Sequence, residues 1–232
     1  MKFEIIIPTY NDFESVKVLL GEIEKCSLTE VEFLIINNGS TDSRVWEILK
    51  NNGFNWRAVS IPKNLGFGGG VKAGLRNSKS EYVGWMPGNL KISPRAVCEL
   101  LQDIDLNPDV FLKAVRSGRQ MKFRVKTLLS GVVQSLFMRK FMMDTGGTPT
   151  LIHRNFMDLI CLGPDTFVFE SWCLWLAKYC KKEILRPKIF YGNRIFGRSH
   201  WQNGFSAEAS LMIQILKESR KWASLVSKNG FL

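Results

Sequence analysis

The stretch FEIIIPTYNDFESVKVLLGEIEKCSLTEVEFLIINNGSTD, residues 3–42, decides the fold of this chain. Its first apolar run, Phe3 to Ile7, ends at Pro8 and predicts a short buried strand. A second apolar run, residues 31–36, predicts another strand. Between the two runs, apolar residues recur at the spacing of an amphipathic helix: Val16, Leu19, Leu20 and Ile23. A strand, a helix and a strand in this order indicate a parallel pair joined by a crossover helix.

Capping residues mark where helices begin. Asn11 with Glu14 three residues later is a variant of the capping box. Ser93 as N-cap, with Pro94 in the first helical position, predicts a later helix. Between these helices we expect two more strands and a glycine-rich turn, at Arg57–Ile61, Tyr82–Met86 and Asn64–Gly70. This alternation predicts an α/β fold, a mostly parallel sheet with helices on both faces.

The second half of the chain has a looser pattern. We expect strands at Val110–Val115 and Ile184–Phe190, and helices at Phe169–Cys180 and Ala207–Val226. Another amphipathic helix is predicted by the apolar residues Leu129, Val132, Val133 and Leu136. There is no internal repeat and no low-complexity linker, so the sequence predicts a single domain over residues 1–232.

Charge is the most unusual bulk property. The formal net charge is +11, which indicates an anionic partner. Residues 111–143 carry eight basic side chains and no acidic one, which predicts contact with a membrane surface. A nucleic-acid partner is not expected, because no recognised binding motif is present.

Cysteine content and hydropathy bear on the compartment. The five cysteines are scattered without a CxxC pair, which argues against a zinc site or a disulfide framework and favours a reducing compartment. No apolar run is long enough for a transmembrane helix or a signal peptide. We therefore expect a cytoplasmic protein bound peripherally to the inner face of the membrane.

Three N-terminal motifs resemble the nucleotide-sugar half of family 2 glycosyltransferases: Ile6–Asn11, Asn37–Asp42 and Asn64–Gly70. The later motifs Asp144–Pro149, Pro164-Asp165 and Arg194–Trp201 resemble the acceptor half of dolichyl- and polyprenyl-phosphate sugar transferases. The resemblance implies the GT-A fold, with a nucleotide-sugar half at 1–105, an acceptor half at 106–205 and a C-terminal helix at 206–232. It also implies a nucleotide-sugar donor and a polyprenyl-phosphate or glycan acceptor.

The matched motifs assign roles to individual residues. The implied donor-binding residues are Pro8, Tyr10, Asn11, Asn38, Ser40, Asp42, Asn64, Gly66 and Gly88. Phosphate groups would be held by Arg194, Arg198 and Ser199, and the acceptor or membrane by Arg116 and Arg119. The implied catalytic residues are Asn89, Lys91, Asp165 and Glu170.

One departure from the family pattern affects the cofactor. The family places an Asp-x-Asp after the fourth strand to bind a divalent metal, and here Pro87-Gly88-Asn89 stands in its place. Divalent Mg²⁺ and Mn²⁺ prefer anionic oxygen ligands, so we predict no metal site and expect no certain cofactor. Lys91, in the position where the family has Gln, is expected to supply positive charge to the diphosphate instead.

Several alternatives remain open at this point. The missing aspartates also fit a catalytically inactive glycosyltransferase-like subunit, or a nucleotide-binding partner protein. A soluble saccharide acceptor would require Asp165 or Glu170 as a base. Both carboxylates are equally consistent with a structural role at the start of a helix. A dinucleotide-dependent oxidoreductase fails, because the glycines do not follow the first strand.

Overall fold

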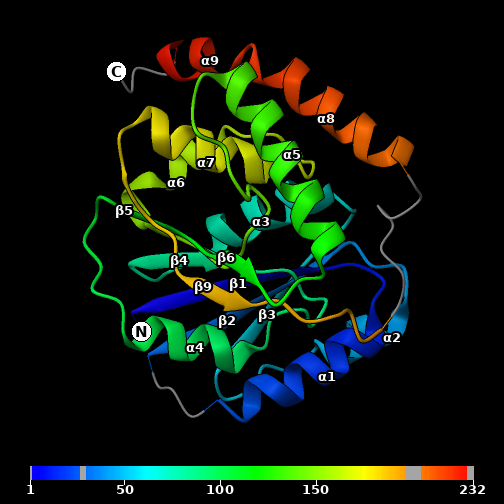
Figure 1. The fold of residues 1–232 in the computed structure, drawn as a ribbon. Helices are drawn as coiled ribbons and strands as arrows, with labels where there is room; N and C mark the ends of the chain where they lie inside the picture. Colours follow the sequence, from blue (N-terminus) through cyan, green and yellow to red (C-terminus); the bar gives the residue numbers. More distant parts are fainter. Residues whose placement is uncertain (1, 27–29, 197–204, 229–232) are drawn as a thin grey trace.

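The computed structural model describes residues 2–26, 30–196 and 205–228. The first half alternates strands and helices in the expected order (Figure 1). These elements are β1 (Phe3–Thr9), α1 (Phe13–Glu24), β2 (Val31–Asn38), α2 (Ser43–Ile48), β3 (Trp56–Ile61), α3 (Gly66–Asn77), β4 (Tyr82–Trp85) and α4 (Pro94–Gln102).

The second half contains shorter strands and longer helices. It comprises β5 (Val110–Lys113), β6 (Val115–Ser117), α5 (Met121–Met138), β7 (Thr150–His153), the 3₁₀ turn η1 (Arg154–Phe156), α6 (Met157–Cys161), α7 (Phe169–Tyr179), β8 (Glu183–Leu185), β9 (Lys188–Phe190), α8 (Phe205–Ser219) and α9 (Trp222–Lys228). No helix within the described residues is both long and apolar enough to cross a membrane.

Seven strands form the central sheet, in the order β3-β2-β1-β4-β7-β5-β8. All neighbouring pairs are parallel except those of β7, which runs antiparallel to both β4 and β5. A second, two-stranded sheet pairs β6 with β9 in parallel. The carboxyl ends of β1, β2 and β4 therefore meet at one edge of the central sheet, which is where open α/β sheets bind ligands.

Alternate residues of β1 and β2 pack on opposite faces of the sheet, which places helices on both. Ile6 and Leu34 belong to the apolar cluster that contains residues of α3, α6, α7 and α9. Ile5 and Phe33 belong to the cluster that contains residues of α1 and α4. All four side chains are fully buried. The predicted α/β architecture, a mostly parallel sheet with helices on both faces, is confirmed.

Three of the expected elements are divided in the structure. The strand expected at Val110–Val115 covers β5 and the first residue of β6, which belong to different sheets. The strand expected at Ile184–Phe190 is two strands, β8 and β9, which belong to different sheets. Pro187 lies between them and offers only its carbonyl, which accepts a hydrogen bond from the Val115 amide at 2.7 Å. The closing helix is also two helices, α8 and α9, and the break lets Trp222 and Val226 enter the core beside α7.

The start of α1 also differs from the expectation. Asn11 is not the N-cap; that position is Asp12, whose side chain makes no capping hydrogen bond. Asn11 instead has a positive φ of 48°, a conformation that asparagine tolerates better than most residues. Its side chain turns toward the loop after β2. The prediction at Ser93 is confirmed, because its side chain accepts a hydrogen bond from the Ala96 amide at 3.2 Å.

Candidate functional site

A cleft of about 510 Å³ opens at the carboxyl ends of β1, β2 and β4. The ends of these strands and the turns that follow them supply eight of its fifteen lining residues, since each strand ends at the same edge of the sheet. The lining residues are Pro8, Thr9, Tyr10, Asp12, Asn38, Asn64, Gly66, Phe67, Pro87, Gly88, Asn89, Thr166, Phe167, Arg194 and Leu211. They include six of the nine residues expected to bind a donor.

Asn38 shapes the cleft by holding the glycine-rich loop. Its Nδ2 donates to the Gly66 carbonyl at 2.9 Å and to Asn64 Oδ1 at 3.3 Å, and its Oδ1 accepts from the Leu65 amide at 3.0 Å. Gly66 has a φ of +76°, where a side chain would be strained. A Cβ on Gly70 would lie 2.9 Å from Pro8 Cβ. The loop can therefore pack against the end of β1 only with glycine at these positions.

Asn11, Ser40 and Asp42, the other three expected donor residues, are not among the residues that line the cleft. Asn11 Oδ1 accepts from the amides of Thr41 and Asp42 at 2.8 and 3.2 Å, and Ser40 Oγ accepts from the Asn11 amide at 3.0 Å. Asp42 caps α2, and the hydrogen bond from Arg44 lowers the pKa of its carboxyl. These contacts brace the turns after β1 and β2 against each other.

Aromatic side chains form one wall of the cleft. Phe67 and Phe167 stack with ring centroids 5.2 Å apart and an angle of 7° between the rings. Tyr10 leaves 37% of its surface exposed in the same cleft. Leu211 of α8 completes this wall. The sequence analysis did not predict either phenylalanine as a lining residue, although Phe67 lies in the glycine-rich motif Asn64–Gly70 and Phe167 lies two residues after the Pro164-Asp165 motif, and no local pattern pointed to Leu211.

Four basic residues lie near one another around Lys91 and Tyr191, and of the four only Arg194 lines the cleft. Lys91 Nζ and Arg116 Cζ each lie 5.7 Å from the centroid of the Tyr191 ring. Burial lowers the pKa of Lys91, and the charges of Arg119, Arg194 and Arg116 lower it further. We call Lys91, Arg116, Arg119 and Arg194 the cationic cluster.

Arg194 connects the cationic cluster to the cleft. Its Nη2 pairs with Asp12 Oδ2 at 2.9 Å. Its Nε is buried, and no hydrogen-bond partner for it lies among the described residues. A buried donor without a partner is costly unless a ligand satisfies it. Arg198 and Ser199, the other residues expected to bind phosphate, lie outside the described residues.

Arg116 and Arg119 are held in place by their own contacts. The Arg116 guanidinium pairs with Asp144, and its Nε donates to Asp144 Oδ1 at 2.7 Å. Burial works against ionisation of Asp144, but the charge and hydrogen bonds of Arg116 outweigh it and lower the pKa of the carboxyl. Arg119 Nη1 donates to Thr127 Oγ1 at 2.8 Å. The Asp144–Pro149 motif thus begins with the carboxylate that positions Arg116.

Neither carboxylate expected to act in catalysis lines the cleft. Glu170 is buried, where it pairs with the fully buried Lys113 and accepts from Trp85 Nε1 at 2.9 Å. Asp165 pairs with Lys72 at 2.5 Å, and its carbonyl accepts from the Gly69 amide at 3.0 Å. These contacts tie α7 to the sheet and the segment before α7 to the glycine-rich loop.

The residues present do not fit a divalent metal. Asn89 lines the cleft, but its Oδ1 accepts a hydrogen bond from the Lys91 amide at 3.2 Å. Asp12 is already paired with Arg194. Across the part of the chain that the structure describes, no three His, Cys, Asp or Glu side chains are grouped to hold a metal ion. A divalent metal would require anionic oxygen ligands, whereas the side chains near Asn89 include the cations Lys91 and Arg194.

Comparison with known proteins places this arrangement in a family. A model described as glycosyl transferase family 2 matches residues 4–161. The chain is 25% identical over 211 residues to the undecaprenyl-phosphate 4-deoxy-4-formamido-L-arabinose transferase of Enterobacter sp. (strain 638). The matched region covers 86% of this chain and 62% of that protein. The chain is 27% identical over 134 residues to the poly-beta-1,6-N-acetyl-D-glucosamine synthase of Staphylococcus epidermidis, covering 56% of this chain and 31% of that protein.

The chain therefore spans less than two thirds of the length of these relatives. A solved structure, glucosyl-3-phosphoglycerate synthase from Mycobacterium tuberculosis in complex with Mn²⁺ and UDP-glucose, matches with a TM-score of 0.70 at 15% identity. That match covers 94% of this chain and 78% of the other, and it shows a shared GT-A fold. The family match spans more than half of the chain and contains β1, β2, the glycine-rich loop and β4, so the protein belongs to glycosyl transferase family 2.

Proposed function

We propose that this protein transfers a sugar from a nucleotide-sugar donor to the phosphate of a polyprenyl-phosphate acceptor, without a divalent metal. The observation that carries the proposal is the cationic cluster, whose Lys91 lies two residues after Pro87-Gly88-Asn89, the segment that stands in place of the Asp-x-Asp of the family. The names of the relatives support the two substrate classes.

The donor would lie along the cleft with its base toward Pro8 and Tyr10. The stacked rings of Phe67 and Phe167 supply further apolar surface in the cleft. The diphosphate would then reach Asn89 and Arg194, which also line the cleft. Bound there, a phosphate oxygen satisfies the Arg194 Nε that otherwise lacks a partner among the described residues.

The reaction needs charge stabilisation more than proton transfer. An oxygen of the acceptor phosphate attacks the anomeric carbon of the sugar, and the bond from that carbon to the nucleoside diphosphate breaks. Negative charge then grows on the departing diphosphate, and Lys91 and Arg194 offset it. The acceptor phosphate is already ionised near neutral pH, because its second pKa is about 6, so it needs no general base. Glu170 and Asp165 accordingly keep structural roles.

The acceptor would approach from the side of Arg116 and Arg119. Both arginines belong to the cationic cluster, and two positive groups suit an acceptor that carries a phosphate. A polyprenyl tail remains in the bilayer, so the protein would work at the membrane surface. A glycan acceptor, such as a surface polysaccharide, is the competing class and would require a base, and Asp12 is the only carboxylate among the described residues that line the cleft.

A transfer assay tests the proposal. The full chain is incubated in EDTA with a panel of labelled nucleotide sugars and a short polyprenyl phosphate, and label is counted in the organic phase. The proposal predicts label in the organic phase from at least one donor, and loss of that transfer in Arg194→Gln. Donor binding without transfer would favour the non-catalytic, nucleotide-binding alternative, and transfer to a soluble glycan alone would contradict the lipid-phosphate acceptor.

A further inference from the structure

Helix α5 presents its apolar side chains to the outside of the molecule. Leu129 is 61% exposed and Leu136 is 77% exposed, although both are large aliphatic residues. The exposed apolar residues of this helix include Met121, Val125, Leu128, Leu129, Val132 and Leu136. Their spacing of four, three, one, three and four residues follows a single face of a helix. We call this set the outer face of α5.

The opposite side of α5, which faces the body of the protein, carries mostly small or polar residues, and the partly buried Met138 packs against the core near its end. Its only buried residues are Gly131 and Gln134. A Cβ on Gly131 would lie 2.5 Å from Met143 Sδ, so the helix approaches the following loop closely. Ser135 Oγ donates to the Gly131 carbonyl at 2.6 Å and accepts from the Met142 amide at 2.7 Å. Most of the large apolar side chains of the helix therefore face outward, the reverse of an ordinary surface helix.

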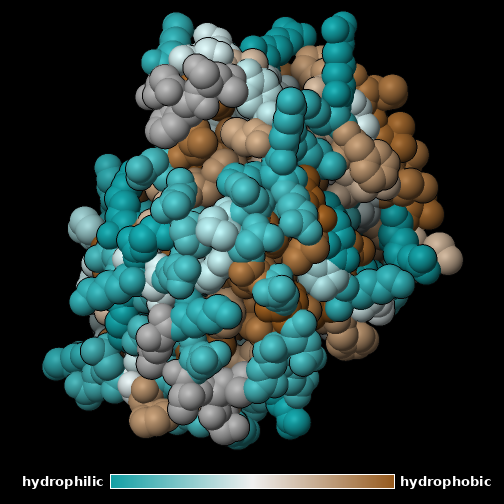
Figure 2. Space-filling model, turned by 90° about the vertical axis from the view of Figure 1, so that its left-hand side faces the viewer, coloured by the Kyte–Doolittle hydropathy of each residue, from teal (hydrophilic) through white to brown (hydrophobic). Residues whose placement is uncertain are grey.

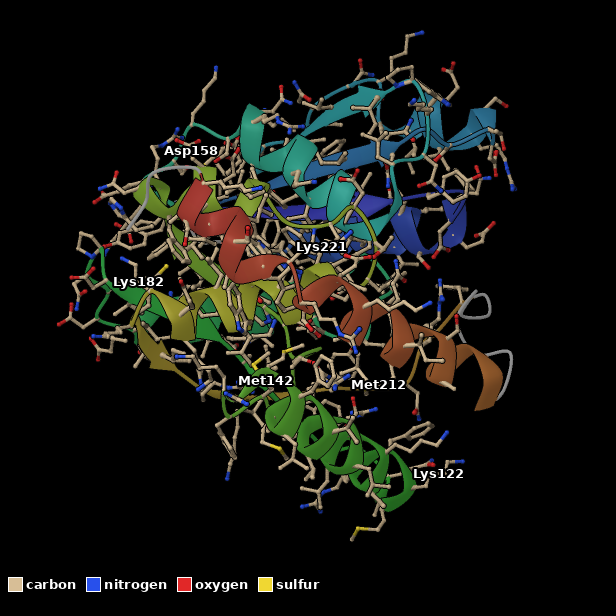
Figure 3. All side chains as sticks on the ribbon, turned by 90° about the horizontal axis from the view of Figure 1, so that it is seen from above. Lys122, Met142, Asp158, Lys182, Met212 and Lys221 are labelled. Carbon is tan, nitrogen blue, oxygen red and sulfur yellow. The ribbon has the colours of Figure 1, made fainter. Side chains whose placement is uncertain are left out.

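Figures 1 and 3 show α5 at the edge of the molecule, with α8 as its neighbour on one side. Lys122, at the tip of α5 in Figure 3, points away from the body. In Figure 2, hydrophobic side chains gather at the upper right of the molecule, the side to which α5 moves when Figure 1 is turned. Exposed apolar surface of this extent, next to basic residues, marks an interaction site.

Positive charge surrounds the outer face. The basic residues in and directly after α5 are Lys122, Arg124, Lys126, Arg139 and Lys140, and no acidic residue occurs from 111 to 143. Beyond α5, Arg220 lies 5.5 Å from the Phe137 ring and Lys178 lies 5.8 Å from the Phe141 ring. Phe141 is 70% exposed at the end of the same segment.

We propose that the outer face of α5 docks into the headgroup region of a bilayer that contains anionic lipid. An amphipathic helix with apolar residues on one face and flanking lysines and arginines binds such an interface, with its apolar side chains below the headgroups. A second copy of this chain would bring the same positive charges face to face. An anionic membrane complements those charges, so it is the occupant that the surface fits.

The docking surface extends the proposed function. Binding to the membrane does not depend on that function; only the link between the docking surface and the acceptor rests on it. Helix α5 begins two residues after Arg119 of the cationic cluster. When α5 lies in the headgroup region, the cluster is held at the depth where the phosphate of a polyprenyl phosphate resides. Phe190, whose side chain is exposed, lies near the same end of α5. Its ring packs against Gly118, and a Cβ on Gly118 would be 2.5 Å from that ring.

Co-sedimentation of the full chain with vesicles tests the docking surface. We expect binding to phosphatidylcholine vesicles that contain phosphatidylglycerol, and weaker binding when salt is added or phosphatidylglycerol is omitted. Lys122→Gln and Lys140→Gln should each weaken binding about fivefold. Absence of binding at low salt would overturn the proposal.

Two variants distinguish vesicle binding through the outer face of α5 from non-specific binding through any exposed apolar residue. Leu129→Glu with Leu136→Glu should reduce binding at least about tenfold. Phe54→Glu, at a position 89% exposed before β3, should bind as the unaltered protein does. Circular dichroism and thermal unfolding check that the variants fold. Unchanged binding of the α5 variant, or a dimer that this variant dissociates without any vesicle binding, would overturn the membrane assignment.

Measuring donor binding on the same variants distinguishes failure of the docking surface from failure of the proposed function. Donor binding measured by thermal shift without vesicles should be equal in the α5 variant and the unaltered protein. Loss of vesicle binding with intact donor binding would count against the docking surface alone. Vesicle binding by a protein that neither binds nor uses any nucleotide sugar would count against the proposed function alone.

Discussion

The guanidinium of Arg194 pairs with the carboxylate of Asp12 at 2.9 Å, although the two residues are 182 positions apart in the chain. Asp12 directly precedes α1 at the carboxyl end of β1, and Arg194 follows β9. The pair therefore fixes a cation from the end of the chain against the cleft formed by its beginning. It leaves Arg194 Nε available to a ligand.

Replacing Lys91 tests whether a side chain does the work of a metal. Lys91→Ala should lower turnover by about 10²–10³-fold, the usual effect of losing one electrostatic contact in a transition state. Lys17→Ala removes an exposed lysine of α1 and should leave turnover unchanged. Both rates are measured in EDTA. A Lys91→Ala enzyme as fast as the unaltered protein would remove Lys91 from the mechanism.

The pH dependence of kcat/KM should report the ionisation of Lys91. Burial, followed by the charges of Arg119, Arg194 and Arg116, lowers the pKa of Lys91 from its ordinary value of 10.5. The charged form is the one that stabilises the diphosphate, so kcat/KM should fall on the alkaline side at a pH below 10.5. Lys91→Arg keeps its charge at higher pH and should move this fall upward. The same alkaline fall in both proteins would show that another group causes it.

Two glycine substitutions should change stability in opposite directions. A Cβ on Gly74 of α3 would lie 2.3 Å from Ile6 Cγ2 in the core, so Gly74→Ala should destabilise by about 1–3 kcal/mol through overpacking. Gly21 of α1 has nothing within 4 Å of the added Cβ, so Gly21→Ala should stabilise by about 0.5–1 kcal/mol. Urea unfolding measures both. A stabilised Gly74→Ala would mean that α3 does not pack against β1 as described.

Glu170 offers a test between structural and catalytic roles. Glu170→Gln leaves the fully buried Lys113 without its charged partner, which should cost about 3–5 kcal/mol of unfolding free energy. Glu99→Gln breaks an exposed pair with Arg95 and should cost less than about 1 kcal/mol. Urea unfolding again gives both values. If Glu170→Gln abolished turnover while unfolding stayed unchanged, Glu170 would be the catalytic base after all.

The nucleotide-sugar half of the fold could be read from the sequence because its signals are local. Each of β1, β2 and β4 is a compact apolar run that ends at proline, asparagine or another polar turn residue. Strand β7 (Thr150–His153) was not expected, although it lies in the middle of the sheet. Its four residues are all buried and show no alternation, and only pairing with β4 and β5 defines them.

The site was predictable where backbone topology alone positions a residue. Pro8 and Asn38 lie at the carboxyl ends of β1 and β2, and Gly88 follows β4, so their convergence on the cleft follows from a parallel sheet. Side-chain direction was not predictable. The Asn11 side chain accepts hydrogen bonds from the turn after β2 and does not line the cleft, and Glu170 is buried where it pairs with Lys113 and accepts a hydrogen bond from Trp85.

Donor binding with and without metal tests the central claim most directly. Calorimetric titration of the full chain with UDP-, GDP-, dTDP- and CMP-sugars, in EDTA and then in Mn²⁺, measures each Kd for the unaltered protein and for Lys91→Ala. The account predicts that at least one donor binds in EDTA, that Mn²⁺ changes its Kd by less than about threefold, less than 1 kcal/mol, and that Lys91→Ala weakens it. Binding that requires Mn²⁺, or no binding of any donor, would contradict it.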